Sequence, residues 1–220
     1  MNTLKIFVYG MSGSGKDTIA NYLKNSLGFM KLRIADTIKR IICEKCDLTF
    51  DELELQKRSN KSLRSLHHRV GEYLDTPIDI YLNNFNDNNG TTNRINQLIN
   101  GTALDYQHFS DDFIQKTCKV ICDVRTFEWS EQLLNAGWIG IFLTRTTPEF
   151  KESDNFTEQN IFSNGGIEKL WKSTLDKEKI IIINNDPEVF LNIYDIPFIL
   201  TDGSEEKLIL TVKQKILNKL

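Results

Sequence analysis

A glycine-rich turn lies between a short apolar run and an amphipathic run near the start of the chain. It restricts the fold more than any other feature. Residues 4–9 read LKIFVY, a β-branched and aromatic segment that suits a buried parallel strand. The turn GMSGSGK follows at 10–16, and residues 16–28 then carry apolar side chains at helical spacing up to a glycine stop. Strand, glycine-rich loop and helix are the context that a phosphate-binding loop requires, so we predict such a loop.

The residues of this loop have separate expected roles. Glycines let backbone N–H groups turn inward around phosphate oxygens, and the following helix adds the positive end of its dipole. Lys16 would reach the transferring phosphates of a nucleotide. A glycine-rich turn with an accidental lysine is the alternative, which the flanking strand and helix disfavour. The expected cofactor-binding residues are Gly10, Ser12, Gly13, Ser14, Gly15, Lys16 and Thr18.

Aspartate occupies the position after the loop lysine, where a hydroxyl usually contacts Mg²⁺. The first hydroxyl comes one residue later, at Thr18, which we expect to be a metal ligand. Asp17 has two interpretations of equal weight: it contacts a magnesium-bound water, or its charge stabilises the helix N-terminus. Lys16 and Asp17 are therefore catalytic candidates. The loop predicts a nucleotide phosphotransferase rather than a regulatory GTPase.

Strands and helices alternate along the rest of the chain. This order predicts an α/β fold, a three-layer sandwich of the P-loop type in which ligands bind at the carboxyl ends of parallel strands. We expect five parallel strands in its core. Strand candidates lie at 4–9, 29–34, 119–124, 138–144, 179–184 and 196–201, and Asp202-Gly203-Ser204 caps a C-terminal helix.

Two stretches interrupt this alternation within what we expect to be a single domain over 1–220. Residues 36–117 are mostly helical in pattern, polar and irregular, and they are interpreted as a helical acceptor-binding insert. For its asparagine-rich part, a solvated connector without chemistry is the favoured reading. Residues 145–178 are charged and weakly patterned, which suits a lid-like segment that would exclude water from a phosphoryl group.

Charged side chains follow two of the expected strands. Asp123 ends the strand at 119–124, where a carboxylate can hold Mg²⁺ through water, and Arg125 could bind an acceptor phosphate or the transferring group. We count both as catalytic candidates and Asp123 as a metal candidate. A surface Asp-Arg pair is the alternative. Arg145 ends another strand and is a substrate-binding candidate.

Composition narrows the expected partners and compartment. The net charge of −3 over 220 residues gives no general basic field that would recruit nucleic acid. No apolar run approaches the roughly 20 residues that a membrane span needs. We therefore expect a cytoplasmic protein with small-molecule nucleotide partners, without a nucleic-acid or membrane partner, and with a homodimer as an open alternative.

The four cysteines are interpreted as packing thiols. Cys43 and Cys46 form a CxxC pattern, which could be half of a zinc site or a redox pair. No second pair and no nearby histidine completes a metal set. Cys118 and Cys122 flank an apolar strand, as small core residues do in a reducing compartment.

Several motifs, in collinear order, resemble those of bacteriophage deoxynucleoside monophosphate kinases, within the wider nucleoside monophosphate kinase group. The family's GKDT ending appears in SGSGKDT, which places threonine two positions after the lysine. Its F-A-D-P-L-K segment is similar to FMKLRIADTIKR, its D-V-R-F-P-N-E segment to CDVRTFEWSEQLL, and its N-D-G-x-x-E-x-L to ILTDGSEEKL. The resemblance covers most of the chain outside 86–116 and 163–195.

The resemblance implies Mg²⁺-dependent transfer of the γ-phosphate of ATP to a (deoxy)nucleoside 5′-monophosphate. By position, Asp36, Lys39 and Arg64 would line the acceptor side. A helix cap is the alternative for Asp36, and a solvated helix face is the alternative for Lys39 and Arg64. A phage source would place the protein in the cytoplasm of its host.

The chain departs from the family at the residues after D-V-R. The family's Asn-Glu falls on Glu128-Trp129, so Glu128 or Glu131 would have to supply the acidic side chain. Two other functions therefore stay open: a kinase of another small phosphorylated metabolite, and a nucleotide-binding protein without turnover.

Overall fold

A computed structural model of the chain shows two compact units, Met1–Leu32 with Asp105–Leu220, and Arg33–Leu104. The predicted single domain with a helical insert and a lid stays a prediction. Most of the insert, its asparagine-rich part and residues 146–165 lie outside the described residues. The structure describes residues 3–10, 13–33, 39, 42–43, 46–59, 99–100, 109–124, 127–145, 166–186 and 196–217.

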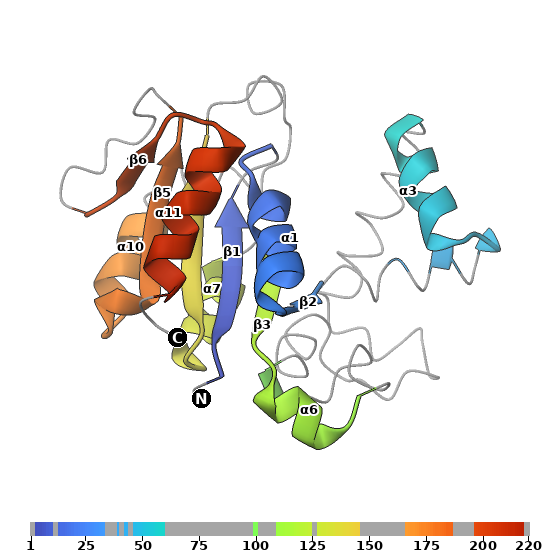
Figure 1. Ribbon diagram of the computed structural model, residues 1–220, viewed down its shortest axis with the longest axis horizontal. Coiled ribbons are helices and arrows are strands. Elements are labelled where there is room, and N and C mark those ends of the chain that lie inside the picture. The colour runs from blue at the N-terminus through green and yellow to red at the C-terminus, as the bar shows by residue number, and fades with distance from the viewer. Residues whose placement is uncertain are drawn as a thin grey trace. The chain divides into compact units, whose positions relative to one another are not determined.

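A parallel sheet runs through the first unit (Figure 1). Its six strands have the order β2-β3-β1-β4-β5-β6, and every neighbouring pair is parallel. The predicted α/β class is confirmed. The predicted number of five strands is wrong, because a three-residue strand pairs with β5 and extends the sheet. The strands are β1 (Lys5–Gly10), β2 (Met30–Leu32), β3 (Lys119–Val124), β4 (Ile139–Thr144), β5 (Ile180–Asn185) and β6 (Ile199–Thr201).

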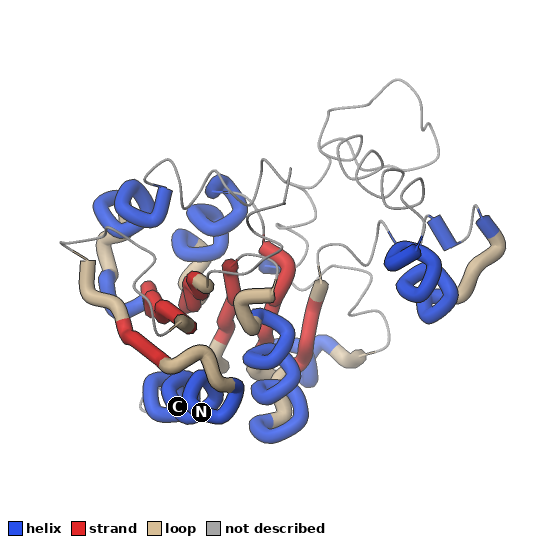
Figure 2. Tube along the Cα trace, turned by 90° about the horizontal axis from the view of Figure 1, so that it is seen from above, coloured by secondary structure: helices blue, strands red, loops and turns tan. Residues whose placement is uncertain are grey.

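Helices cover both faces of this sheet. The helices α1 (Lys16–Leu27) and α11 (Glu205–Leu217) lie side by side on one face. The other face carries α7 (Phe127–Asn135) and α10 (Gly166–Ser173), and the view from above shows the strands between the two layers (Figure 2). The predicted three-layer arrangement is therefore present. The remaining described helices are α6 (Asp111–Lys116) before β3, the 3₁₀ turn η2 (Lys177–Lys179) before β5, and α3 (Phe50–Ser59) in the second unit.

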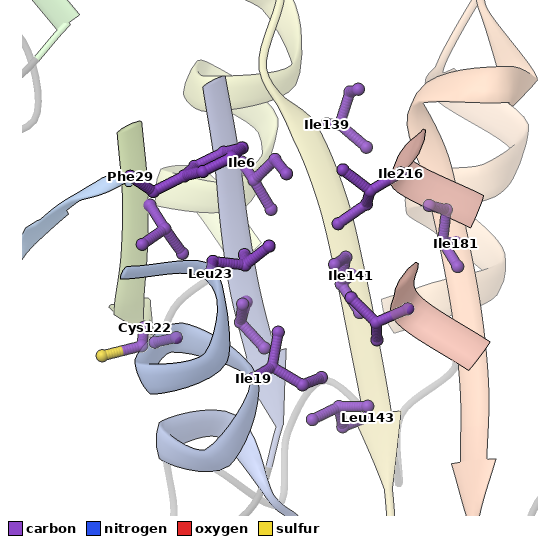
Figure 3. Close-up of a cluster of buried hydrophobic side chains, with 14 of the residues drawn as sticks. Ile6, Ile19, Leu23, Phe29, Cys122, Ile139, Ile141, Leu143, Ile181 and Ile216 are labelled. Atoms are coloured by element: carbon purple, nitrogen blue, oxygen red, sulfur yellow. The ribbon is translucent and has the colours of Figure 1, made fainter. Parts of the chain in front are cut away.

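The main hydrophobic core lies between the sheet and the pair α1 and α11 (Figure 3). Alternate residues of the strands face these helices because successive side chains of a strand point to opposite sides. Ile19 and Leu23 of α1, with Ile216 of α11, are fully buried against them. The strand residues labelled in this core are Ile6, Cys122, Ile139, Ile141, Leu143 and Ile181.

Aromatic packing fills the opposite face of the central strands. The rings of Phe7 in β1 and Phe142 in β4 meet edge to face, with centroids 5.7 Å apart. Gly140 leaves room for them, because a Cβ there would lie 2.7 Å from an atom of each ring. The packing of these two rings therefore depends on the missing side chain at Gly140.

The sequence argued against a metal site at the cysteines and against a membrane-spanning helix, and the described residues bear on both points. All four cysteines are among the described residues and none forms a disulfide. Cys43 and Cys122 are buried, but Cys46 is exposed, so the packing interpretation is wrong for Cys46. In the described ranges no three His, Cys, Asp or Glu side chains gather as a metal set. Among the same residues, no helix is both long enough and apolar enough to span a membrane.

Candidate functional site

The glycine-rich loop leaves the sheet at its centre. Gly10 is the last residue of β1, and α1 begins at Lys16, so the strand and helix predicted on either side are present. The strand β1 pairs with β3 on one side and with β4 on the other. The carboxyl ends of three adjacent strands therefore surround the start of the loop, which is where α/β proteins bind ligands.

Two glycines of the loop have no room for a side chain. A Cβ at Gly10 would lie 2.5 Å from Ser14 Oγ and 2.7 Å from the carbonyl oxygen of Leu143. Gly15 has a φ of 103°, in the left-handed region, and a Cβ there would lie 2.7 Å from the side chain of Leu208. Gly10 and Gly15 are thus packed tightly against β4 and α11.

The lysine of the loop reaches back across it. Lys16 Nζ donates a hydrogen bond of 2.5 Å to the carbonyl oxygen of Gly10. Its side chain therefore spans the loop from the first residue of α1 to the last residue of β1. The cation and the N-terminal end of α1 act on the same small region, and both favour an anion there.

Asp17 lies in the first turn of α1, as the charge interpretation requires. Its Oδ1 is 3.1 Å from Lys31 Nζ, and the same ammonium donates to Asn21 Oδ1 at 2.9 Å. The thiol of Cys122 is 3.7 Å from the same carboxylate oxygen. Asp17 therefore has a cationic partner on β2 that the sequence did not indicate. Its contact with a magnesium-bound water stays a prediction.

Asp123 and Arg145 lie at the same end of the sheet as the loop. Val124 is the register partner of Tyr9, and Leu143 is the register partner of Gly10. Asp123 directly precedes Val124 on β3, Arg145 follows Leu143 by two residues just after β4, and both are half-buried. The structure thus brings the two charged residues to the strands that flank the loop.

The remaining predicted residues are less completely described. Lys39 belongs to the second unit and is buried, which a solvated helix face does not explain. Glu128 is exposed and Glu131 is half-buried on α7, and Thr18 is half-buried in α1. The roles proposed for these residues stay predictions. Ser12, Asp36, Arg64 and Arg125 lie outside the described residues.

Buried polar side chains at the ends of β4, β5 and β6 were missed from the sequence. Thr144 and Asn184 are register partners, and so are Asn185 and Thr201. All four side chains belong to residues that are at most 3 % exposed. The available signal was the pair of asparagines that ends the otherwise apolar strand IIIINN. Such groups need hydrogen-bond partners when they are buried, and one of these partners belongs to the loop.

The first turn of α11 begins close to this group. Ser204 Oγ accepts a hydrogen bond from the backbone N–H of Lys207, so the predicted cap is present. Asp202 Oδ1 accepts from the backbone N–H and the hydroxyl of Ser204. These hydrogen bonds from Ser204 lower the pKa of the Asp202 carboxyl, which stays ionised at neutral pH. The turn after β6 is therefore held by local polar contacts.

Comparisons with known proteins relate part of the chain to kinases. No family model matches the chain. Shikimate kinases of Chlorobaculum parvum and Chlorobium luteolum are each 44 % identical over 59 residues, which is 23 % of this chain and 32 % and 29 % of those proteins. The chain thus spans about a third of the length of these curated relatives. A solved shikimate kinase from Acinetobacter baumannii, in complex with shikimate, has a TM-score of 0.42 and 15 % identity, covering 99 % of this chain and 95 % of that one.

Proposed function

We propose that the chain is an ATP- and Mg²⁺-dependent kinase of a small metabolite, with a (deoxy)nucleoside 5′-monophosphate as its acceptor. The observation that carries this proposal is the loop between β1 and α1. Gly10 and Gly15 leave no space for side chains, and Lys16 Nζ lies 2.5 Å from the carbonyl oxygen of Gly10. Backbone N–H groups, a helix N-terminus and a lysine together suit the phosphates of a donor nucleotide.

Magnesium fits the oxygen groups near the loop. Thr18 and Asp123 would hold the ion, directly or through water, because Mg²⁺ prefers hydroxyl, carboxylate and phosphate oxygens. When bound, the ion neutralises charge on the donor phosphates. Lys16 would add positive charge on the side of the transferring phosphate. Catalysis would then depend on placement and charge neutralisation rather than on covalent chemistry.

Two observations favour different acceptors. Collinear motifs resembling phage deoxynucleoside monophosphate kinases favour a monophosphate, whose anionic oxygen can attack without an essential general base. Arg125 and Arg145 would meet the phosphate charge, with Asp36, Lys39 and Arg64 on the acceptor side. The 59-residue segment that is 44 % identical to shikimate kinases favours a different small metabolite as the second candidate. A nucleotide-binding protein without turnover is the third, because Glu128-Trp129 replaces the family's Asn-Glu.

An acceptor screen tests the proposal. ADP release from Mg·ATP is measured with each common deoxy- and ribonucleoside monophosphate, and in parallel with shikimate. We expect release that depends on at least one monophosphate. Release with shikimate alone would retain the kinase and replace the acceptor. Folded protein that binds ATP but releases no ADP with any acceptor would contradict a kinase and support binding without turnover.

A further inference from the structure

A chain of two hydrogen bonds links β6 to the glycine-rich loop through the end of β5. The hydroxyl of Thr201 donates to Asn185 Oδ1 at 2.8 Å, and Asn185 Nδ2 donates to the carbonyl oxygen of Ser14 at 3.0 Å. Ser14 is 0 %, Asn185 1 % and Thr201 3 % exposed. Because all three are buried, water does not compete for these bonds, and losing one leaves a polar group without a partner.

The hydroxyl of Thr201 determines which end of the amide faces the loop. An asparagine side chain has a donor end and an acceptor end, and only the donor end can bond to a carbonyl oxygen. The same hydroxyl is 3.4 Å from the carbonyl oxygen of Asn184, a longer and weaker alternative. Bonding to Asn185 Oδ1 leaves Nδ2 turned toward Ser14. Thr201 therefore orients Asn185 without touching the loop itself.

Holding the Ser14 carbonyl also sets the direction of the next N–H. The peptide unit is planar and trans, so its C=O and N–H point in opposite directions. When Asn185 draws the carbonyl of Ser14 toward β5, the N–H of Gly15 is turned away from β5. Gly15 has a φ of 103°, a conformation that other residues rarely adopt, so glycine is strongly favoured at this position of the loop.

We propose that Asn185 is a positioning residue of the donor site, with Thr201 as its orienting partner. By holding Ser14 it keeps the N–H of Gly15 directed to where a phosphate oxygen of the donor would bind. This inference rests on the proposed function, because only a nucleotide-binding protein would have a donor phosphate at the loop. It assigns to two residues of β5 and β6 an effect on nucleotide phosphates that they do not touch.

The opposite face of the sheet supplies a matched control. The hydroxyl of Thr144 donates to Asn184 Oδ1 at 2.8 Å, and both residues are at most 1 % exposed. Asn184 precedes Asn185, so its side chain points to the other side of β5. Thr144→Val and Thr201→Val therefore each remove one buried hydroxyl that donates to an asparagine at the same distance. Only Thr201 belongs to the chain that reaches Ser14.

Calorimetric titration with Mg·ATP separates positioning from general stabilisation. We expect Thr201→Val to weaken ATP binding about three- to tenfold, the loss of roughly one net hydrogen bond. Thr201→Val and Thr144→Val are expected to lower the melting temperature by similar amounts. Thr144→Val should leave ATP affinity unchanged. Thr201→Ser, which restores the hydroxyl, should recover affinity. Equal ATP affinity in Thr201→Val and Thr144→Val would overturn the inference.

Amide hydrogen exchange without nucleotide keeps this test independent of the proposed function. Exchange at Gly15 should be faster in Thr201→Val than in the wild type and unchanged in Thr144→Val. A wild type that binds no ATP would remove the proposed function, while selective exchange at Gly15 would still support the restraint on the loop. Equal exchange in the two variants would reject the restraint.

Discussion

At the scale of single residues, Asp17, which departs from the usual loop motif, has an ion-pair partner on a strand. The residue follows the loop lysine, and its carboxylate lies 3.1 Å from Lys31 Nζ on β2. The Lys31 side chain is 9 % exposed and that of Asp17 is 69 % exposed. An ion pair with one exposed member contributes modestly to stability, of the order of 0–1 kcal/mol. The pair therefore links α1 to β2 and adds little to the stability of the unit.

Replacement of either member distinguishes this role from one at magnesium. Asp17→Asn and Lys31→Met are each expected to lower the free energy of unfolding by less than about 1 kcal/mol. If the ion pair is the role of Asp17, the magnesium concentration that gives half-maximal turnover should stay the same in both. Urea unfolding and magnesium titrations measure the two quantities. A magnesium requirement that rises in Asp17→Asn and not in Lys31→Met would instead place Asp17 at the metal's water shell.

At the scale of elements, Lys119 joins the end of α6 to the start of β3. Its ammonium donates to the carbonyl oxygen of Ile114 and, at 3.0 Å, to that of Thr117. Residues with positive charge are favoured at the C-terminus of a helix, where carbonyl groups lack partners. Burial, and then the nearby charge of Lys5, lower the pKa of Lys119 from 10.5. The contact thus holds the ammonium in a poorly solvated place.

The lowered pKa gives a pH dependence of known sign. Between the folded pKa of Lys119 and 10.5, the unfolded chain holds this proton more tightly than the folded chain does. Stability should therefore rise with pH in that window through Lys119. Unfolding by urea at several pH values is compared for the wild type and Lys119→Met. The contributions of the other lysines are common to both proteins and cancel in the difference. The free energy of unfolding of the wild type should rise relative to that of the variant as pH approaches 10.5. A difference that is constant or shrinks would contradict the assignment.

The elements themselves were largely predictable, because their signals are local. The bounds of β1, β3, β4 and β5 fall within about two residues of the segments expected from apolar runs. The edge strands β2 and β6 are three residues each and shorter than expected. An edge strand ends where its single neighbour stops pairing, and the sequence of the strand does not contain that information.

The same distinction between local and distant signals applies to the candidate site. The loop was predictable because its glycines, lysine, strand and helix are contiguous in sequence. The role of Asn185 was not, because its partner Ser14 is 171 positions away. Lys31 was missed although it is only 14 positions from Asp17, because its contact depends on how α1 packs beside β2. Both contacts depend on tertiary packing rather than on local sequence.

At the scale of the whole molecule, the strand order brings the candidate site residues together at the carboxyl ends of the central strands. The order β3-β1-β4 in the centre brings Asp123, the loop and Arg145 to neighbouring strand ends. The net charge is −3, so attraction of a nucleotide has to come from local groups rather than from a general field. Lys16 and the N-terminus of α1 are the described groups best suited to this, so the proposed function rests on the claim that they bind the donor.

Equilibrium binding of Mg·ATP to Lys16 variants tests that claim most directly. We compare the wild type with Lys16→Met and with Lys24→Met, a control in the last turn of the same helix, where the side chain is exposed. The wild type and Lys24→Met should bind ATP with equal affinity. Lys16→Met should bind at least about tenfold more weakly, because a charge-assisted contact contributes roughly 1.5–3 kcal/mol. Folded wild type that binds no ATP, or equal binding by all three proteins, would contradict the claim.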